Sequence, residues 1–273
     1  MDTPINNNTK EYIYKEIGEK KLALLFIKPE NELYDRAPVY FIIPGGGWHM
    51  EKKEDMVSCS QKSVDELRKK GFAVVAPDYR VTPEGADMED IISDCFDAAR
   101  FVAHFADVLK IDKEKFVLSG HSAGGHLALM LAYAPQNLFT KDSVLDDTFG
   151  VSAVMPMSPP TILYEKDVPM TSVLSILPEL EPTPEIAHRV SPYDHITQNC
   201  PPTLTSAGTS DRLVFCNSSE LLYKKLLENN VEAELMLSLG GGHLFEKMHD
   251  NIEPSPTMED IQNEMIKFAL KHI

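Results

Sequence analysis

The sequence predicts an α/β protein with a mainly parallel central sheet of about eight strands and helices on both faces. Short apolar runs alternate with helical patterns, the runs are almost wholly hydrophobic, and a length of 273 residues suits one domain of this kind, spanning 1–273. Strands are expected at residues 11–16, 22–27, 38–43, 72–76, 116–118, 151–157, 203–207 and 233–239.

The first two strands flank Gly18 and predict a β-hairpin. Residues 54–69 follow a helical pattern that stops before Gly71, a suitable residue for a helix C-terminus. The clearest helix spans 88–109, where apolar side chains recur at 3.6-residue spacing. Residues 127–134 are apolar on all sides, which is typical of a central, buried helix.

Two more helices are expected near the C-terminal end, at about 217–229 and around Met258 to Phe268. Segment 159–202 breaks the alternation, because it is rich in proline and has only short apolar stretches. We expect this segment to form a small cap or lid over the carboxyl edge of the sheet, inserted within the single domain.

The charge balance excludes some classes of partner. Lys and Arg number 26 against 42 Asp and Glu, a net charge of −16, so nucleic acids and anionic membranes would be repelled. The N-terminus has no basic segment followed by an apolar run, and the four cysteines are widely spaced. These features favour a cytoplasmic protein with reduced cysteines.

The motif Gly120-His121-Ser122-Ala123-Gly124 is the strongest chemical signal. It joins a short apolar strand to the buried helix, which is the setting of a nucleophile elbow. A turn this sharp needs small neighbours, and it would lift the Ser122 hydroxyl above the sheet next to the first amides of the helix.

A serine nucleophile needs a base, and the base needs an orienting acid. His243 is the best candidate base, since it follows the strand at 233–239 in a run of glycines; His249 is the second choice. Asp211 is the best candidate acid, in the loop after the strand at 203–207, with Asp194 and Asp78 as alternatives.

The run Pro44-Gly45-Gly46-Gly47-Trp48 ends the first buried parallel strand and can bring backbone amides close to a ligand. We expect the oxyanion donors to be the amides of Gly46, Gly47 and Ala123. Trp48 and His121 are candidate substrate contacts, although Trp48 is equally suited to packing against the sheet. No metal-binding or phosphate-binding motif is visible, so neither metal nor cofactor is expected.

With these residues placed, the chain resembles the α/β-hydrolase superfamily, and within it the small carboxylesterases that include hormone-sensitive-lipase-like enzymes and carbohydrate acetyl esterases. The resemblance covers residues 37–270. It rests on the segments PGGGW (44–48), PDYR (77–80), GHSAGGHLA (120–128), SPYDHI (191–196), GTSD (208–211) and GGGH (240–243). Pro44 stands where many relatives have histidine, so another residue must hold this loop here.

The resemblance implies a serine ester hydrolase that acts on a small-molecule ester through an acyl-enzyme, with Ser122, Asp211 and His243 as the triad. The proline at 44 is similar to that of sugar and acetyl-xylan esterases, which implies acetyl groups on carbohydrate. An amidase, such as an arylformamidase or a small peptidase, is the alternative because it would use the same triad. A non-catalytic binding module is a third possibility that the complete triad disfavours.

Overall fold

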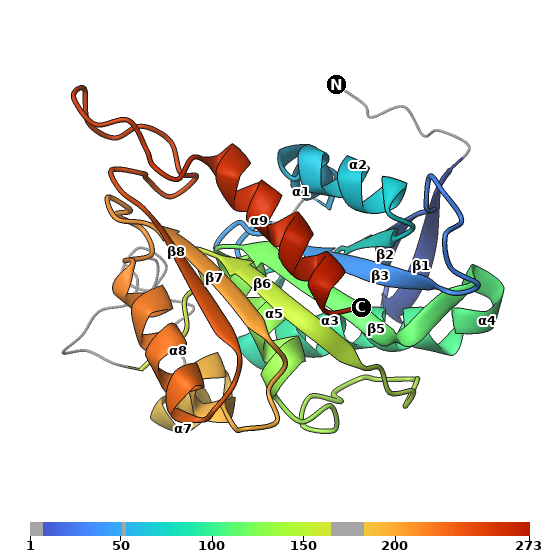
Figure 1. The fold of residues 1–273 in the computed structure, drawn as a ribbon. Helices are drawn as coiled ribbons and strands as arrows, with labels where there is room; N and C mark the ends of the chain where they lie inside the picture. Colours follow the sequence, from blue (N-terminus) through green and yellow to red (C-terminus); the bar gives the residue numbers. More distant parts are fainter. Residues whose placement is uncertain (1–7, 51–52, 165–182) are drawn as a thin grey trace.

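The computed structural model describes residues 8–50, 53–164 and 183–273, which form an eight-stranded sheet between two layers of helices (Figure 1). The strand order is β1-β2-β4-β3-β5-β6-β7-β8. The strands are β1 (Thr9–Ile17), β2 (Lys20–Ile27), β3 (Ala37–Ile43), β4 (Ala73–Pro77), β5 (Ile111–His121), β6 (Val151–Met157), β7 (Thr203–Gly208) and β8 (Ala233–Ser238). The predicted α/β fold class is confirmed.

The sheet is parallel except at one edge. β1 and β2 form the predicted antiparallel hairpin about Gly18, whose φ of 58° lies in the left-handed region that glycine adopts without strain. β2 also pairs antiparallel with β4, and every pair from β4 across to β8 is parallel. The carboxyl ends of the parallel strands therefore meet at one rim of the sheet.

Helices cover both faces, as expected for parallel strands. One face carries α1 (Lys53–Cys59), α2 (Gln61–Lys69) and α9 (Met258–Lys271); the other carries α3 (Met88–His104), α5 (Ala123–Tyr133) and α8 (Asn217–Glu228). All seven residues of β3 are buried, because this strand lies in the middle of the sheet.

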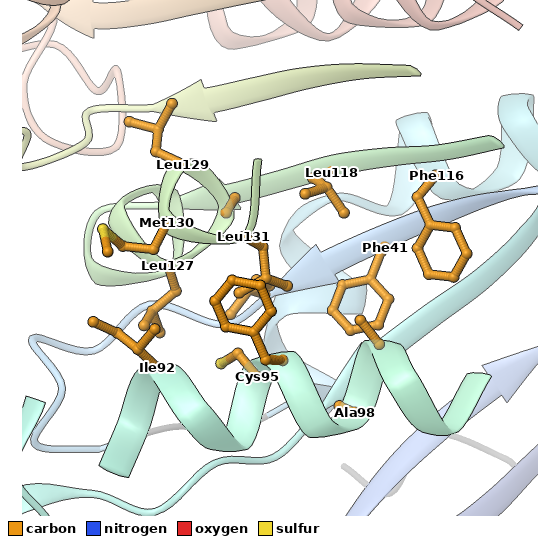
Figure 2. Packing of buried hydrophobic residues seen from close by; sticks show 14 of the residues in the cluster. Phe41, Ile92, Cys95, Ala98, Phe116, Leu118, Leu127, Leu129, Met130 and Leu131 are labelled. Carbon is orange, nitrogen blue, oxygen red and sulfur yellow. The ribbon is translucent and has the colours of Figure 1, made fainter. Parts of the chain in front are cut away.

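The core between the sheet and the second helical layer is built largely around α5, which is buried except at Ala132. Figure 2 shows Ile92, Cys95 and Ala98 of α3 facing the side chains of α5 and the strands. The buried position of α5 agrees with its all-apolar sequence and fixes the place where β5 turns into it.

Three elements differ in extent from the predicted ones. The helix expected at 54–69 is divided at Ser60 into α1 and α2, and the one expected at 88–109 ends at His104, with a short α4 (Ala106–Leu109) after it. β5 begins at Ile111 rather than at residue 116, because Ile111 pairs with Ala37 of β3 before the exposed, charged residues that follow.

Of the predicted cap at 159–202, residues 165–182 lie outside the described part of the chain. The returning segment contains α7 (Pro184–Arg189) and a 3₁₀ turn, η3 (Pro192–His195). The cap therefore stays a prediction. Within the described ranges, none of the helices combines the length and the hydropathy needed to span a bilayer.

Candidate active site

Ser122 lies in a strained turn between β5 and α5. Its φ of 56° and ψ of −122° are unusual for a residue with a side chain, and Ala123 already belongs to the helix. The flanking glycines make this turn possible: a Cβ on Gly120 would lie 2.3 Å from the Gly124 carbonyl group, and one on Gly124 would lie 2.1 Å from Ile43 O. The motif therefore has the geometry of the predicted nucleophile elbow.

The backbone fixes Ser122 at the rim of the sheet. Its N–H donates to Met157 O at the end of β6 (2.8 Å), and its carbonyl accepts from the His126 N–H one turn into α5 (3.0 Å). The next amides open α5, where helix geometry leaves the first N–H groups without partners inside the helix. Such groups can face a developing negative charge.

Asp211 and His243 are joined directly. His243 Nδ1 lies 2.6 Å from Asp211 Oδ2, and the Asp211 side chain is completely buried. The other oxygen, Oδ1, accepts from the backbone N–H groups of Leu213 (2.8 Å) and Val214 (3.0 Å). A buried carboxylate with both oxygens bonded holds the imidazole in one orientation.

The loops that carry this pair brace each other. Ser210 N donates to Gly241 O (2.9 Å), and Gly240 N donates to Thr209 Oγ1 (2.9 Å). A Cβ on Gly208 would lie 2.3 Å from the carbonyl oxygens of Gly241 and Gly242, so glycine permits this close approach. These contacts between the two loops therefore fix the distance between Asp211 and His243.

His121, next to Ser122, contacts the His243 loop. Its Nε2 lies 2.7 Å from the His243 carbonyl oxygen, and the two rings are 4.6 Å apart. Burial, with a smaller contribution from the neighbouring His243, lowers the pKa of His121 to about 4. The candidate base therefore lies beside the residue that precedes the candidate nucleophile.

The alternative acids and base have other partners. His249 Nε2 lies 3.0 Å from Ser210 Oγ. Asp194 accepts from Tyr164 Oη (2.9 Å) and pairs with His188 (2.8 Å), while Asp78 pairs with Lys53 (2.7 Å). Burial alone would lower the pKa of Lys53, but the hydrogen bond and charge of Asp78 raise it overall.

The glycine loop after β3 approaches the elbow closely. A Cβ on Gly45 would lie 2.6 Å from His121 O, and Gly46 and Gly47 have φ values of 117° and 62°. Tyr79 holds this loop: its buried hydroxyl donates to Pro44 O (2.7 Å) and approaches Gly45 O (3.3 Å). No pattern in the sequence indicates this role for Tyr79, which lies within the PDYR segment.

Trp48 is fully buried, and its indole N–H donates to His126 Nδ1 (3.3 Å). The imidazole of His126 packs edge-on against the indole and reaches Val190 O through Nε2 (2.7 Å). Burial lowers the pKa of His126 to about 4. Trp48 therefore packs against His126, and its predicted contact with substrate stays a prediction.

In the described part of the chain, no group of three or more His, Cys, Asp or Glu side chains is arranged to hold a metal ion.

The family assignment comes from the sequence match: residues 25–226 match the model of the BD-FAE family. The chain belongs to the BD-FAE family. The predicted membership of the α/β-hydrolase superfamily is confirmed.

Two curated relatives come from Mycobacterium tuberculosis. The probable carboxylic ester hydrolase LipM is 29% identical over 213 residues, covering 74% of this chain and 47% of LipM. Esterase LipC is 23% identical over 267 residues, covering 92% of this chain and 64% of LipC. The chain thus spans about half the length of LipM and less than two thirds of LipC.

Among solved structures, Thermogutta terrifontis esterase 2 superposes with a TM-score of 0.78 at 24% identity. The match covers 97% of this chain and 95% of that chain in its tabun-modified form. At this identity the likeness establishes the shared α/β-hydrolase fold.

Proposed function

We propose that this member of the BD-FAE family is a serine ester hydrolase. Ser122 Oγ attacks the ester carbonyl, and His243 Nε2 takes the proton that the hydroxyl loses. Asp211 holds the imidazole in the required tautomer and stabilises the imidazolium that forms. His243 then gives its proton to the departing alcohol, which leaves an acyl group on Ser122.

The observation that carries the proposal is the 2.6 Å contact between His243 Nδ1 and Asp211 Oδ2. A carboxylate can only accept, so the proton of the neutral imidazole lies on Nδ1 and the lone pair lies on Nε2. The lone pair of His243 Nε2 is therefore available to accept the proton of the Ser122 hydroxyl. The strained backbone of Ser122 supports the same role, because strain of this kind is concentrated at functional sites.

The oxyanion of the tetrahedral intermediate is assigned to the amides of Gly46, Gly47 and Ala123. The first two belong to the loop that Tyr79 holds against the elbow, and the third opens α5. Water then attacks the acyl-enzyme with His243 again as base. The proton returns to Ser122, and the carboxylic acid is released.

The names of the relatives agree with this chemistry, since LipM is described as a probable carboxylic ester hydrolase and LipC as an esterase. The finer assignment, to short acyl groups and in particular acetyl groups on carbohydrate, rests on the resemblance to acetyl esterases. Structures of T. terrifontis esterase 2 with propionate and butyrate are in keeping with short acids.

The test of the triad uses p-nitrophenyl acetate. Ser122→Ala and Asp211→Asn should each lower kcat by roughly 10⁴-fold while the protein stays folded. His249→Gln is the matched control and should stay near the wild-type rate. Labelling of the wild type but not of Ser122→Ala by a fluorophosphonate probe would identify the nucleophile. Equal rates for Ser122→Ala and the wild type would exclude the mechanism.

The substrate class needs a second measurement. A series of p-nitrophenyl esters should show a fall in kcat/KM beyond short acids, and acetylated xylo-oligosaccharides should release acetate. A maximum at long acyl chains would contradict the acyl assignment. Faster turnover of N-formylkynurenine than of any ester would favour an arylformamidase.

A further inference from the structure

A cavity of about 280 Å³ opens beside the proposed catalytic residues. It lies on the side of the sheet that carries α1 and α9, between the glycine loop after β3 and the first turn of α9. The proposed mechanism assigns this space no role.

The cavity borders the proposed site. Gly45 and Gly46 line it, and they belong to the loop that carries two of the assigned oxyanion donors. His121 and Leu244 also line it, and each is adjacent in sequence to a proposed catalytic residue. A group attached to an ester bound at Ser122 can therefore extend into the cavity.

Four of the eleven residues that line the cavity are methionines. Met50 comes from the glycine loop, Met56 from α1, Met157 from the end of β6 and Met258 from the first turn of α9. Methionine side chains are unbranched and polarisable, so they adapt to apolar groups of different shapes. Among the described residues that line it there is no lysine or arginine, and the acidic one, Asp55, is exposed.

We propose that this methionine pocket binds an apolar substituent of the ester that is larger than acetyl. The proposal rests on the proposed ester hydrolysis but departs from its finer assignment to acetyl groups on carbohydrate, because it adds an apolar group to one half of the substrate. A methyl group is about the size of a water molecule, whose share of liquid volume is about 30 Å³, so acetyl would leave most of the space empty. Three polar side chains also line the pocket: Asp55 is exposed, Ser60 is buried, and His121 Nε2 is already bonded to the His243 carbonyl. Four thioethers and a leucine make the remaining walls apolar, so this position suits hydrocarbon.

The apolar group can belong to the acyl half or to the alcohol half of the ester. Two pairs of substrates separate these sources. p-Nitrophenyl acetate and hexanoate vary the acyl group, whereas ethyl acetate and hexyl acetate vary the alcohol. The readout is the ratio of kcat/KM for the larger ester to that for the smaller one within each pair.

Met258→Phe places a bulkier, stiffer side chain at the wall of the pocket. This variant should lower one of the two kcat/KM ratios by about tenfold. A hydrocarbon group that no longer fits an apolar pocket loses a preference of about this size. Ile266→Phe makes a comparable change two turns further along α9, outside the pocket lining, and should leave both ratios unchanged.

A second variant avoids any question of folding. Met50 is 65% exposed at the mouth of the pocket, so Met50→Lys introduces a charge there without disturbing the core. Val144→Lys, at a site 91% exposed and outside the pocket lining, is its control. Met50→Lys should lower the same ratio as Met258→Phe.

A fall in the acyl ratio assigns the pocket to the acyl half, and a fall in the alcohol ratio assigns it to the alcohol half. The proposal would be overturned if both ratios stayed within twofold of the wild-type values in Met258→Phe and in Met50→Lys. It would also be overturned if the wild type hydrolysed neither p-nitrophenyl hexanoate nor hexyl acetate. Turnover of p-nitrophenyl acetate that depends on Ser122 would leave the ester hydrolase intact in these cases. Loss of all ester turnover in the wild type would remove both proposals.

Discussion

His121 Nε2 donates a hydrogen bond to the backbone carbonyl of His243 at 2.7 Å. The two residues are 122 positions apart in the chain, and each adjoins or forms part of the proposed triad. Because burial lowers the pKa of His121 to about 4, its ring is neutral near pH 7 and carries one proton. That proton lies on Nε2, since a carbonyl oxygen can only accept. The bond therefore ties the base loop to the elbow.

Removal of this tie should affect catalysis more than binding. His121→Leu is expected to lower kcat for p-nitrophenyl acetate by roughly tenfold, because His243 would be held less accurately, with a smaller change in KM. His121→Gln keeps a donor and should recover most of the loss. The pH dependence of kcat/KM should keep its shape in both variants, because the neutral His121 does not titrate near pH 7.

His104→Leu is the control for these variants, because His104 is an exposed histidine that pairs with Asp147 far from the site. Full activity of His121→Leu would show that the base loop holds its position without this bond. A shift in the pH profile would instead assign His121 a titrating role.

The turn at Ser122 and the approach of Asp211 to His243 could be anticipated because their signals are local, whereas their catalytic roles stay a proposal. Small residues around Ser122 and glycines before His243 are demanded by the backbone at those places, and the strand order brings the loops to one rim. Strands β3, β4 and β7 were predictable for a similar reason, since each is a short, wholly buried run, whereas β1 is largely polar and was indicated by the hairpin about Gly18.

The contacts that position the site were not predictable in this way. Tyr79 and Pro44 are brought together only when β4 pairs with β3, and His121 meets His243 only when the loops converge. The sequence allowed two roles for Trp48, packing against the sheet or contact with substrate. Neither the size of the side chain nor its neighbours in the sequence distinguishes these roles. Its burial against His126 depends on the distant helix α5.

Tyr79→Phe tests how much the glycine loop depends on its anchor. The variant removes the donor to Pro44 O and leaves a buried carbonyl without this bond, which should lower the free energy of unfolding by about 1–3 kcal/mol. If the loop carries the oxyanion donors, kcat for p-nitrophenyl acetate should also fall, by about tenfold.

Tyr133→Phe is the matched control for Tyr79→Phe. Tyr133 is also buried and bonds to Thr203 Oγ1 at 2.7 Å, but it joins α5 to β7 away from the glycine loop. A comparable loss of stability with little change in kcat is expected there. Equal losses of kcat in the two variants would contradict a specific role for Tyr79.

The buried His126 should make the free energy of unfolding depend on pH. Folded His126 has a pKa of about 4, because burial disfavours the charged ring, whereas the unfolded residue titrates near 6.5. Between these values the unfolded chain binds more protons, so the free energy of unfolding should rise with pH from about 4 to 6.5. One such histidine contributes on the order of 3 kcal/mol across this window.

His126→Gln removes this titration. Urea unfolding at several pH values should show a lower stability near pH 7, since Trp48 and Val190 lose their imidazole partner, together with a weaker rise between pH 4 and 6.5. His121 has a similarly lowered pKa and should account for part of the slope that remains. An unchanged slope would mean that His126 does not titrate on unfolding in this range.

The hairpin edge of the sheet is held by buried charges that no sequence pattern indicated. Lys15 of β1, whose side chain is 2% exposed, pairs with Asp94 (2.8 Å) and Asp97 (2.7 Å) of α3. Asp94 also pairs with Arg80 (2.7 Å), and Asp97 with Arg100 (2.8 Å). Each buried carboxylate is therefore shared between two cations.

Lys15→Met should lower the free energy of unfolding by about 3 kcal/mol, because two buried carboxylates each lose one of their two cationic partners. Lys267→Met breaks an exposed pair with Glu264 and should change stability by less than about 0.5 kcal/mol. The double variant Lys15→Met/Asp94→Asn removes one charge of each sign, leaves Arg80 paired with Asp90 (3.5 Å) and should recover part of the loss. Urea unfolding at pH 7 measures the free energy of unfolding of all three variants. Equal losses in Lys15→Met and Lys267→Met would show that the buried network stabilises the fold no more than an exposed ion pair does.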